Sequence, residues 1–116
     1  GTGGWHIGEE PHEGTRRKLA EKNISTAGMK GRQLSRQDLE TFDYIIAMDA
    51  ENLGDIHRLA AHDSSAYTAR LLDLVPDSDI EDVPDPYFTG NFDEVYGFIE
   101  DGCRRLLALI REREDL

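Results

Sequence analysis

The sequence predicts an α/β fold, a three-layer, doubly wound parallel sheet, and three observations lead to it. Residues 44–48 (YIIAM) form a short, continuous apolar run rich in β-formers, which is typical of a strand buried on both faces. A helical pattern at residues 50–60 separates this run from a second apolar segment at residues 71–75. A long amphipathic pattern follows at residues 92–113. Helices that alternate with buried strands indicate the α/β class.

Two helices are expected ahead of the first strand. One covers residues 11–22, because Pro11 suits the first position of a helix and Asn23 is a plausible stop. Ser35 and Asp38, three residues apart, resemble a capping box that opens a second, short helix. The first strand then follows.

The remaining elements come after that strand. Asp49 can cap the helix at residues 50–60, whose apolar positions share one face. Residues 71–75 are expected to form the second strand, and residues 77–86, with acids and prolines, a loop. The long pattern at residues 92–113 is expected to lie as a helix along one face of the sheet.

Two strands are too few for a sheet with both faces covered, so the missing strands are expected to lie before Gly1. The opening residues, GTGGW, resemble the middle of a longer chain. At 116 residues the chain can close only one core. We therefore expect residues 1–116 to form a single, N-terminally incomplete domain.

Charge and composition narrow the range of partners. Thirteen basic and 24 acidic residues give a net charge of −11, which argues against nucleic-acid binding and against anchoring to anionic membranes. A small phosphorylated substrate can still bind, since backbone N–H groups oppose a negative overall field locally. A single cysteine, Cys103, excludes a disulfide framework within these residues, and a cytoplasmic location is the simplest expectation.

Five segments, in order and correctly spaced, resemble the low-molecular-weight protein tyrosine phosphatases, particularly the bacterial ones. They are residues 3–8 (GGWHIG), 31–34 (GRQL), 42–49 (FDYIIAMD), 52–53 (NL) and 83–88 (VPDPYF). The resemblance implies a phosphotyrosine phosphatase I-like fold, here without its first strands and first helix. It implies hydrolysis of phosphotyrosine proteins and aryl phosphates, release of inorganic phosphate, and no metal or other cofactor.

In that family the nucleophile lies near the N-terminus, in a loop with the pattern Cys, five residues, Arg-Ser. The loop joins the first strand to the first helix and cradles the phosphate, and its thiolate forms a cysteinyl phosphate. The arginine holds two phosphate oxygens. The present chain does not contain this pattern, because Cys103 is followed directly by Arg104 and Arg105. We expect the 116 residues alone to be inactive.

Asp85 matches the family's general acid, in the segment that begins Asp-Pro-Tyr. Its implied role is to protonate the leaving phenolate and then to activate water against the phospho-enzyme. Pro84 and Pro86 flank it and stiffen the loop. By residue pattern alone, Asp85 is more simply a turn residue, since Asp-Pro is a common turn dipeptide. The resemblance reverses that preference.

Four further residues match the family's substrate pocket. Trp5 and Tyr87 correspond to the aromatic walls between which a phosphotyrosine ring stacks. His6 lies where the family varies its substrate choice. Phe88 stands where many relatives carry a second tyrosine, and this change keeps the wall apolar but removes a phosphorylatable hydroxyl.

Other polar features have structural interpretations. Arg32 and Asp49 are expected to be a structural ion pair or cap rather than catalysts, and the acidic run at residues 77–82 a solvated loop without a calcium pattern. His57 and His62 are spaced wrongly for a helical metal site. Cys103 is expected to be a buried, inert thiol on the apolar face of the last helix.

Three alternative functions can be compared with features of the sequence. An arsenate reductase of the same fold needs additional redox cysteines that this sequence does not contain. A protein-arginine phosphatase differs from a tyrosine phosphatase partly in the catalytic loop, although the Tyr-Phe pair at residues 87–88 favours tyrosine. A non-catalytic, truncated paralogue would bind a partner or phosphopeptide through the aromatic wall, and it would have to fold alone.

Overall fold

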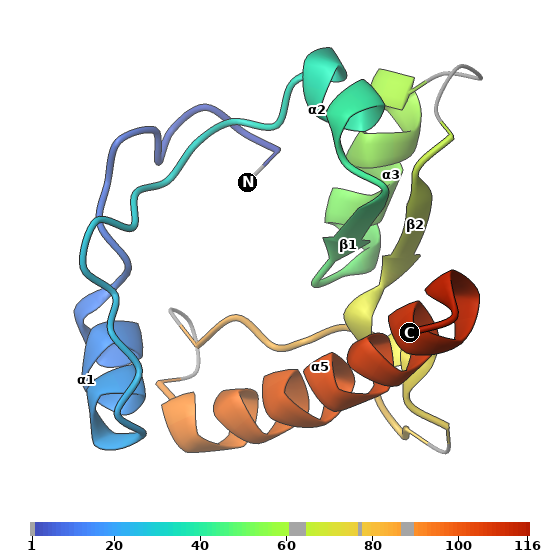
Figure 1. Ribbon diagram of the computed structural model, residues 1–116. Coiled ribbons are helices and arrows are strands. Elements are labelled where there is room, and N and C mark those ends of the chain that lie inside the picture. Colours follow the sequence, from blue (N-terminus) through green and yellow to red (C-terminus); the bar gives the residue numbers. More distant parts are fainter. Residues whose placement is uncertain (1, 61–64, 77, 87–89) are drawn as a thin grey trace.

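The computed structural model describes residues 2–60, 65–76, 78–86 and 90–116. From α2 onward, helices alternate with the two strands, as the α/β prediction requires (Figure 1). In order, the elements are α1 (Glu13–Glu21), α2 (Arg36–Thr41), β1 (Tyr44–Ala47), α3 (Ala50–Ala60), β2 (Tyr67–Arg70), the 3₁₀ helix η1 (Leu71–Leu74) and α5 (Phe92–Glu114).

The sheet consists of β1 and β2, which run parallel. Tyr44 lies opposite Tyr67, and Ala47 opposite Arg70. The crossover between the two strands contains α3, which lies along them in Figure 1. The end of α5 reaches the first residue of each strand, where the Tyr44 hydroxyl donates to Glu114 and Arg113 lies over the Tyr67 ring. The β1–α3–β2 arrangement is the strand–helix–strand unit from which parallel sheets are built. The fold class is therefore confirmed, with two strands in the described part of the chain.

The two faces of β1 contribute to two separate hydrophobic clusters. Ile46 packs against the cluster formed by η1, Val83 and α5. Ile45 and Ala47 pack on the opposite side, in the cluster of α2 and α3. Side chains of successive residues point to opposite faces of a strand. The apolar run thus forms a strand with packing on both faces, although only Ala47 is fully buried and Ile45 and Ile46 are half-buried.

Local capping determines where three helices begin. α3 starts at Ala50 and ends at Ala60, as predicted. At α2 the Ser35 N–H donates to Asp38 Oδ2 at 2.8 Å, so the capping box is confirmed. α1 begins two residues later than predicted, because His12 serves as the N-cap and its Nδ1 accepts the Gly14 N–H.

The predicted second strand at residues 71–75 is wrong. The strand is β2, Tyr67–Arg70, and the chain turns into η1 directly after it. The turn forms because the Asp73 carboxylate accepts the backbone N–H of Arg70 and binds its guanidinium. Leu71 and Leu72 enter the same buried cluster, whereas consecutive residues of a strand would face opposite sides.

The last helix is confirmed, but not every residue of its predicted apolar face. Val95 is buried and Leu106 half-buried against η1, whereas Cys103 is exposed and Leu107 is 51% exposed. Gly102 takes the central core position, and a Cβ there would lie 2.4 Å from Leu71 Cγ. The expectation of a buried thiol is therefore wrong, because Cys103 lies one position beyond the buried stripe.

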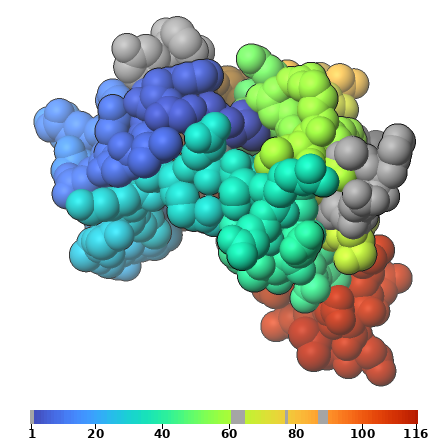
Figure 2. All heavy atoms as spheres, turned by 90° about the horizontal axis from the view of Figure 1, so that it is seen from above, coloured from blue at the N-terminus to red at the C-terminus, as the bar shows by residue number. Residues whose placement is uncertain are grey.

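α1 is attached to the start of α5. Lys18 forms an ion pair with Asp93, and the His12 ring stacks on Phe92 with centroids 5.4 Å apart. The segment before α1 contacts α3 instead, where the Thr2 hydroxyl lies 2.7 Å from Asp55 Oδ2. Figure 2 shows this segment, in dark blue, beside the green surface of α3. No described helix combines the length and hydrophobicity that a membrane span requires.

Candidate active site

The loop that carries Asp85 is attached to the end of β1. The Val83 N–H donates to the Met48 carbonyl at 2.8 Å, and the Val83 side chain is buried in the core. Asp85 follows two residues later and is exposed. In α/β sheets, ligands bind at the carboxyl ends of the strands. The predicted acid thus lies two residues beyond an anchored residue at the carboxyl edge of the sheet.

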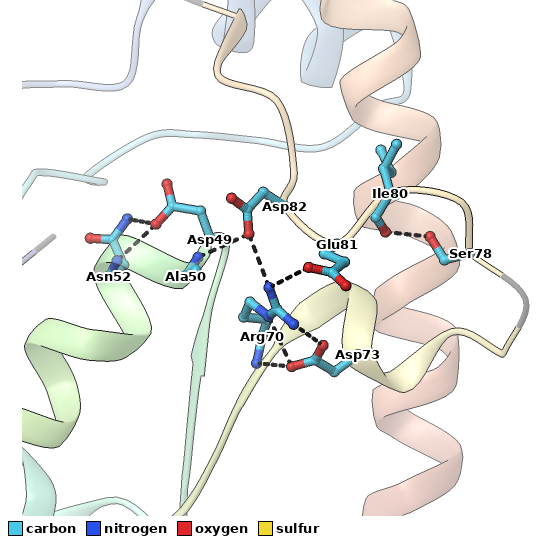
Figure 3. Close-up of polar contacts among 9 residues, drawn as sticks. All are labelled: Asp49, Ala50, Asn52, Arg70, Asp73, Ser78, Ile80, Glu81 and Asp82. Atoms are coloured by element: carbon cyan, nitrogen blue, oxygen red, sulfur yellow. Dashed lines mark hydrogen bonds and ion pairs between the residues drawn. The ribbon is translucent and has the colours of Figure 1, made fainter.

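Two carboxylates cap α3 at the same edge (Figure 3). Asp82 Oδ1 accepts the Ala50 N–H at 2.9 Å, and Asp49 Oδ1 accepts the Asn52 N–H at 2.8 Å. Negative charge is favourable at a helix N-terminus, where backbone N–H groups have no intrahelical partner. The predicted cap by Asp49 is confirmed.

The other main helices also carry caps of their own. His12 caps α1, Ser35 and Asp38 form the capping box of α2, and Asn91 Oδ1 accepts the Glu94 N–H at the start of α5. Side chains of this chain therefore occupy the N-termini of α1, α2, α3 and α5. The phosphate cradle that the family resemblance implies has no counterpart at these four helices.

The Arg70 side chain lies between the end of β2 and the loop that carries Asp85, which we call the acid-bearing loop. Its guanidinium binds both carboxylate oxygens of Asp73, at 2.8 and 3.1 Å, and approaches Glu81 and Asp82 at 3.3 and 3.4 Å. The hydrogen bond from Arg70 lowers the pKa of Asp73, and that of Arg70 is raised in return. The acidic run is therefore not simply solvated, because Glu81 and Asp82 contact this arginine.

Arg32 forms an ion pair with Asp38, which is one of the two structural roles that the sequence predicts. Its guanidinium binds Asp38 with two contacts of 2.9 Å, and Asp38 is only 7% exposed. The guanidinium, together with the Ser35 N–H, lowers the pKa of the Asp38 carboxyl to about 2. The pair holds the start of α2.

The structure places Trp5 and His6 in the segment before α1. Trp5 is 78% exposed, and its ring lies over Gly3, where a Cβ would come within 2.4 Å of it. The exposed His6 Nδ1 lies 2.7 Å from Glu9 Oε2. Trp5 also lines an open hollow of about 490 Å³ beside α3. None of the contacts described for these two side chains reaches the loop of Asp85.

The other two predicted pocket residues, Tyr87 and Phe88, lie outside the described residues. A metal centre was not predicted, and the described His, Cys, Asp and Glu side chains form no group of three that could hold a metal ion.

The chain matches one protein family along almost its whole length. The family model of low molecular weight phosphotyrosine protein phosphatases matches residues 1–115. The chain is 55% identical over 116 residues to the low-molecular-weight protein-tyrosine-phosphatase YfkJ of Bacillus subtilis, and covers 74% of that protein. It is 40% identical over 112 residues to PtpA of Staphylococcus saprophyticus; the match covers 95% of this chain and 69% of that protein.

Solved structures agree with the sequence matches. The crystal structure of YfkJ superimposes with a TM-score of 0.92 at 56% identity, covering 97% of this chain and 71% of that one. The structure of an arginine phosphatase from Drosophila gives a TM-score of 0.85 at 31% identity, covering 92% of this chain and 71% of that one. Taken with the acid-bearing loop at the carboxyl end of a parallel sheet, these matches show that the chain belongs to the low-molecular-weight protein tyrosine phosphatase family.

Proposed function

We propose that these 116 residues carry the general acid and the ring-binding side of a protein tyrosine phosphatase. In the working enzyme, a Cys-x5-Arg segment outside these residues supplies the nucleophile and the phosphate cradle. Residues 1–116 are then a single but incomplete catalytic domain. The substrates are phosphotyrosine proteins in the cytoplasm, and the products are a tyrosine side chain and inorganic phosphate.

The anchored loop of Asp85 is the observation that carries this proposal. Because Val83 is bound to Met48 at the end of β1, the exposed Asp85 carboxyl is held at the ligand-binding edge of the sheet. From there it protonates the phenolate oxygen as the phosphorus–oxygen bond breaks. In the second step it takes a proton from the water that attacks the cysteinyl phosphate.

The aromatic residues provide the second part of the proposed site. The Trp5 ring is exposed, so one of its faces can stack on a phosphotyrosine ring, with Tyr87 and Phe88 as the opposite wall. His6, next to Trp5 and hydrogen-bonded to Glu9, is the residue that we propose to contact the neighbours of the phosphotyrosine in the substrate. These contacts orient the ring relative to Asp85.

The test requires the nucleophile, so we define the extended chain as residues 1–116 preceded by a Cys-x5-Arg segment from a family member. Removing the acid through Asp85→Asn is expected to lower kcat for phenyl phosphate by about 10²–10⁴-fold. The loss is smaller for p-nitrophenyl phosphate, because its better leaving group needs less protonation. Asp79→Asn, an exposed acid of the same loop, is the matched control and leaves both rates unchanged. Equal losses on the two substrates would exclude Asp85 as the acid.

A second candidate is protein-arginine phosphatase, which the match to the Drosophila arginine phosphatase favours. The extended chain can be compared on a phosphotyrosine peptide and a phosphoarginine peptide of the same sequence. We expect the higher kcat/KM on phosphotyrosine, since a planar aromatic ring stacks on Trp5 better than a guanidinium on a flexible stem. A preference for phosphoarginine would replace the first proposal by the second.

A further inference from the structure

We propose that Arg70 is a positioning residue for the reaction, because it fixes the loop that carries Asp85 to the carboxyl end of the sheet. The inference rests on the proposed role of Asp85 as general acid. It concerns the Arg70 cluster, which we define as Arg70, Asp73, Glu81 and Asp82 (Figure 3).

Asp73 determines the orientation of the Arg70 guanidinium. Its side chain is 19% exposed at the end of β2, and Nε and NH2 bind the two oxygens of Asp73 at 3.1 and 2.8 Å. Two parallel N–H···O bonds define the plane of a guanidinium, as a single contact does not. The backbone N–H of Arg70 also donates to Asp73, so the pair belongs to the turn that starts η1.

This orientation directs the third nitrogen, NH1, toward the acid-bearing loop. NH1 lies 3.3 Å from Glu81 Oε2 and 3.4 Å from Asp82 Oδ1. Glu81 is 80% exposed, so its attraction to Arg70 is weak. Asp82 matters more, because the same Oδ1 atom accepts the Ala50 N–H of α3 at 2.9 Å. A single carboxylate oxygen thus joins the loop to the cation and to the helix.

Consecutive loop residues are therefore attached to three different elements. Glu81 and Asp82 contact β2 through Arg70, Asp82 contacts α3, and Val83 hydrogen-bonds to Met48 at the end of β1. Pro84 follows directly and limits the backbone freedom of the next step. Asp85 is only three residues beyond Asp82, so we expect a displacement of Asp82 to move the acid by loosening the hydrogen bond between Val83 and Met48.

Arg70 also balances the charge at this edge. Of the nine residues drawn in Figure 3, Arg70 is the only cation, and Asp49, Asp73, Glu81 and Asp82 are acids. Without the guanidinium, the carboxylates of Asp73, Glu81 and Asp82 lose the cation that all three contact, so their mutual repulsion is less well opposed. We expect the loop to move away from the sheet, taking Asp85 with it. A general acid must lie within hydrogen-bonding reach of the leaving oxygen, so even a small displacement reduces the rate.

The experiment uses the extended chain with Arg70→Met and Arg70→Lys. The matched control is Arg104→Met, which removes an exposed arginine with a 3.2 Å ion pair to Glu100 on α5. For phenyl phosphate we expect Arg70→Met to lower kcat by about 10–100-fold, the scale of an ångström-sized misplacement. The loss is smaller for p-nitrophenyl phosphate and KM hardly changes. For Arg70→Lys we expect a kcat between those of the unmodified protein and Arg70→Met, because an ammonium cannot bind Asp73 through two parallel bonds and also reach Asp82.

A double mutant separates positioning of the acid from general damage to the fold. In an Asp85→Asn background, Arg70→Met should cause little further loss, because the group that it positions is already gone. A loss that is equal for both substrates, or fully additive with Asp85→Asn, would overturn the proposal.

Amide hydrogen exchange gives a readout that does not depend on activity. Arg70→Met should speed exchange of the Val83 N–H, which is bonded to Met48, while Arg104→Met leaves it unchanged. If the extended chain proves inactive, the proposed function fails, and the exchange of Val83 still decides whether Arg70 anchors the loop. Unchanged exchange in Arg70→Met would reject the anchor itself.

Discussion

At the scale of single residues, side-chain carboxylates stabilise the starts of α2 and α3. Asp38 accepts the Ser35 N–H and binds Arg32, and Asp49 accepts the Asn52 N–H. These three interactions span three to six residues of sequence. Local contacts of this kind depend on spacing alone, so the sequence can indicate them.

The ion pair of Asp38 makes stability depend on pH. Arg32 lowers the pKa of Asp38 in the folded protein to about 2, against roughly 3.9 in an unfolded chain. A depressed folded pKa gives stability that is fully present above about pH 4 and is lost as the pH falls toward 2. Arg32→Met should lower the urea midpoint of the extended chain at pH 6, and should flatten its decline between pH 4 and 2.

Arg17→Met is the control for this measurement, since it removes an exposed arginine that pairs with Glu13 at 2.5 Å on α1. Its urea midpoints should follow those of the unmodified protein at every pH. Identical pH profiles for Arg32→Met and the unmodified protein would contradict the role of the pair.

Residues whose contacts lie far away in sequence could not be predicted in the same way. Arg70 meets Glu81 and Asp82 eleven and twelve residues later, across a turn that the sequence does not indicate. The acidic run therefore resembled a solvated loop. The sequence feature that could have indicated these contacts is an arginine at the end of a β-rich segment, followed three residues later by an aspartate.

At the scale of elements, periodicity predicted α3 and α5 well and β2 poorly. The strand Tyr67–Arg70 contains no long apolar run, and the apolar residues that suggested a strand form η1 instead. On α5 the pattern indicated the helix but not the centre of its buried face. Gly102 occupies that centre, and a residue without a side chain is invisible to a hydrophobic pattern.

Two glycines of α5 provide a matched pair of mutations. Gly102→Ala places a Cβ 2.4 Å from Leu71 Cγ, so overpacking should destabilise the extended chain by about 1–3 kcal/mol. Gly97→Ala meets no atom within 4 Å, so it should stabilise the helix by about 0.5–1 kcal/mol. Urea unfolding measures both. Stabilisation by Gly102→Ala would show that Gly102 is not packed against η1.

At the scale of the whole molecule, the chain has few buried residues for its length. Eight hydrophobic side chains are buried in the described part, and the Cα radius of gyration is 14.7 Å. A compact domain of this length has a radius of about 13 Å. The sheet has two strands in the described residues, whereas parallel sheets normally lie buried between helices. The fold class was predictable from the strand pattern, but the sequence could not show how few side chains are buried or how large the radius of gyration is.

This openness predicts that the 116 residues are unstable by themselves. A few hundred Å² of exposed apolar surface costs several kcal/mol at about 25 cal/mol per Å², comparable to the total stability of a small domain. Thermal unfolding of the 116-residue chain should be broad, and the extended chain should give a sharp, cooperative transition. A sharp transition for the 116 residues alone would instead support the non-catalytic paralogue.

Hydrolysis of p-nitrophenyl phosphate by the 116-residue chain, its length verified by intact mass, tests the central claim most directly. We expect no turnover, because the chain carries the proposed general acid Asp85 but no Cys-x5-Arg sequence, and we expect activity in the extended chain. Turnover by the 116 residues that Asp85→Ala abolishes would contradict the account. Another group within this chain would then replace the thiolate.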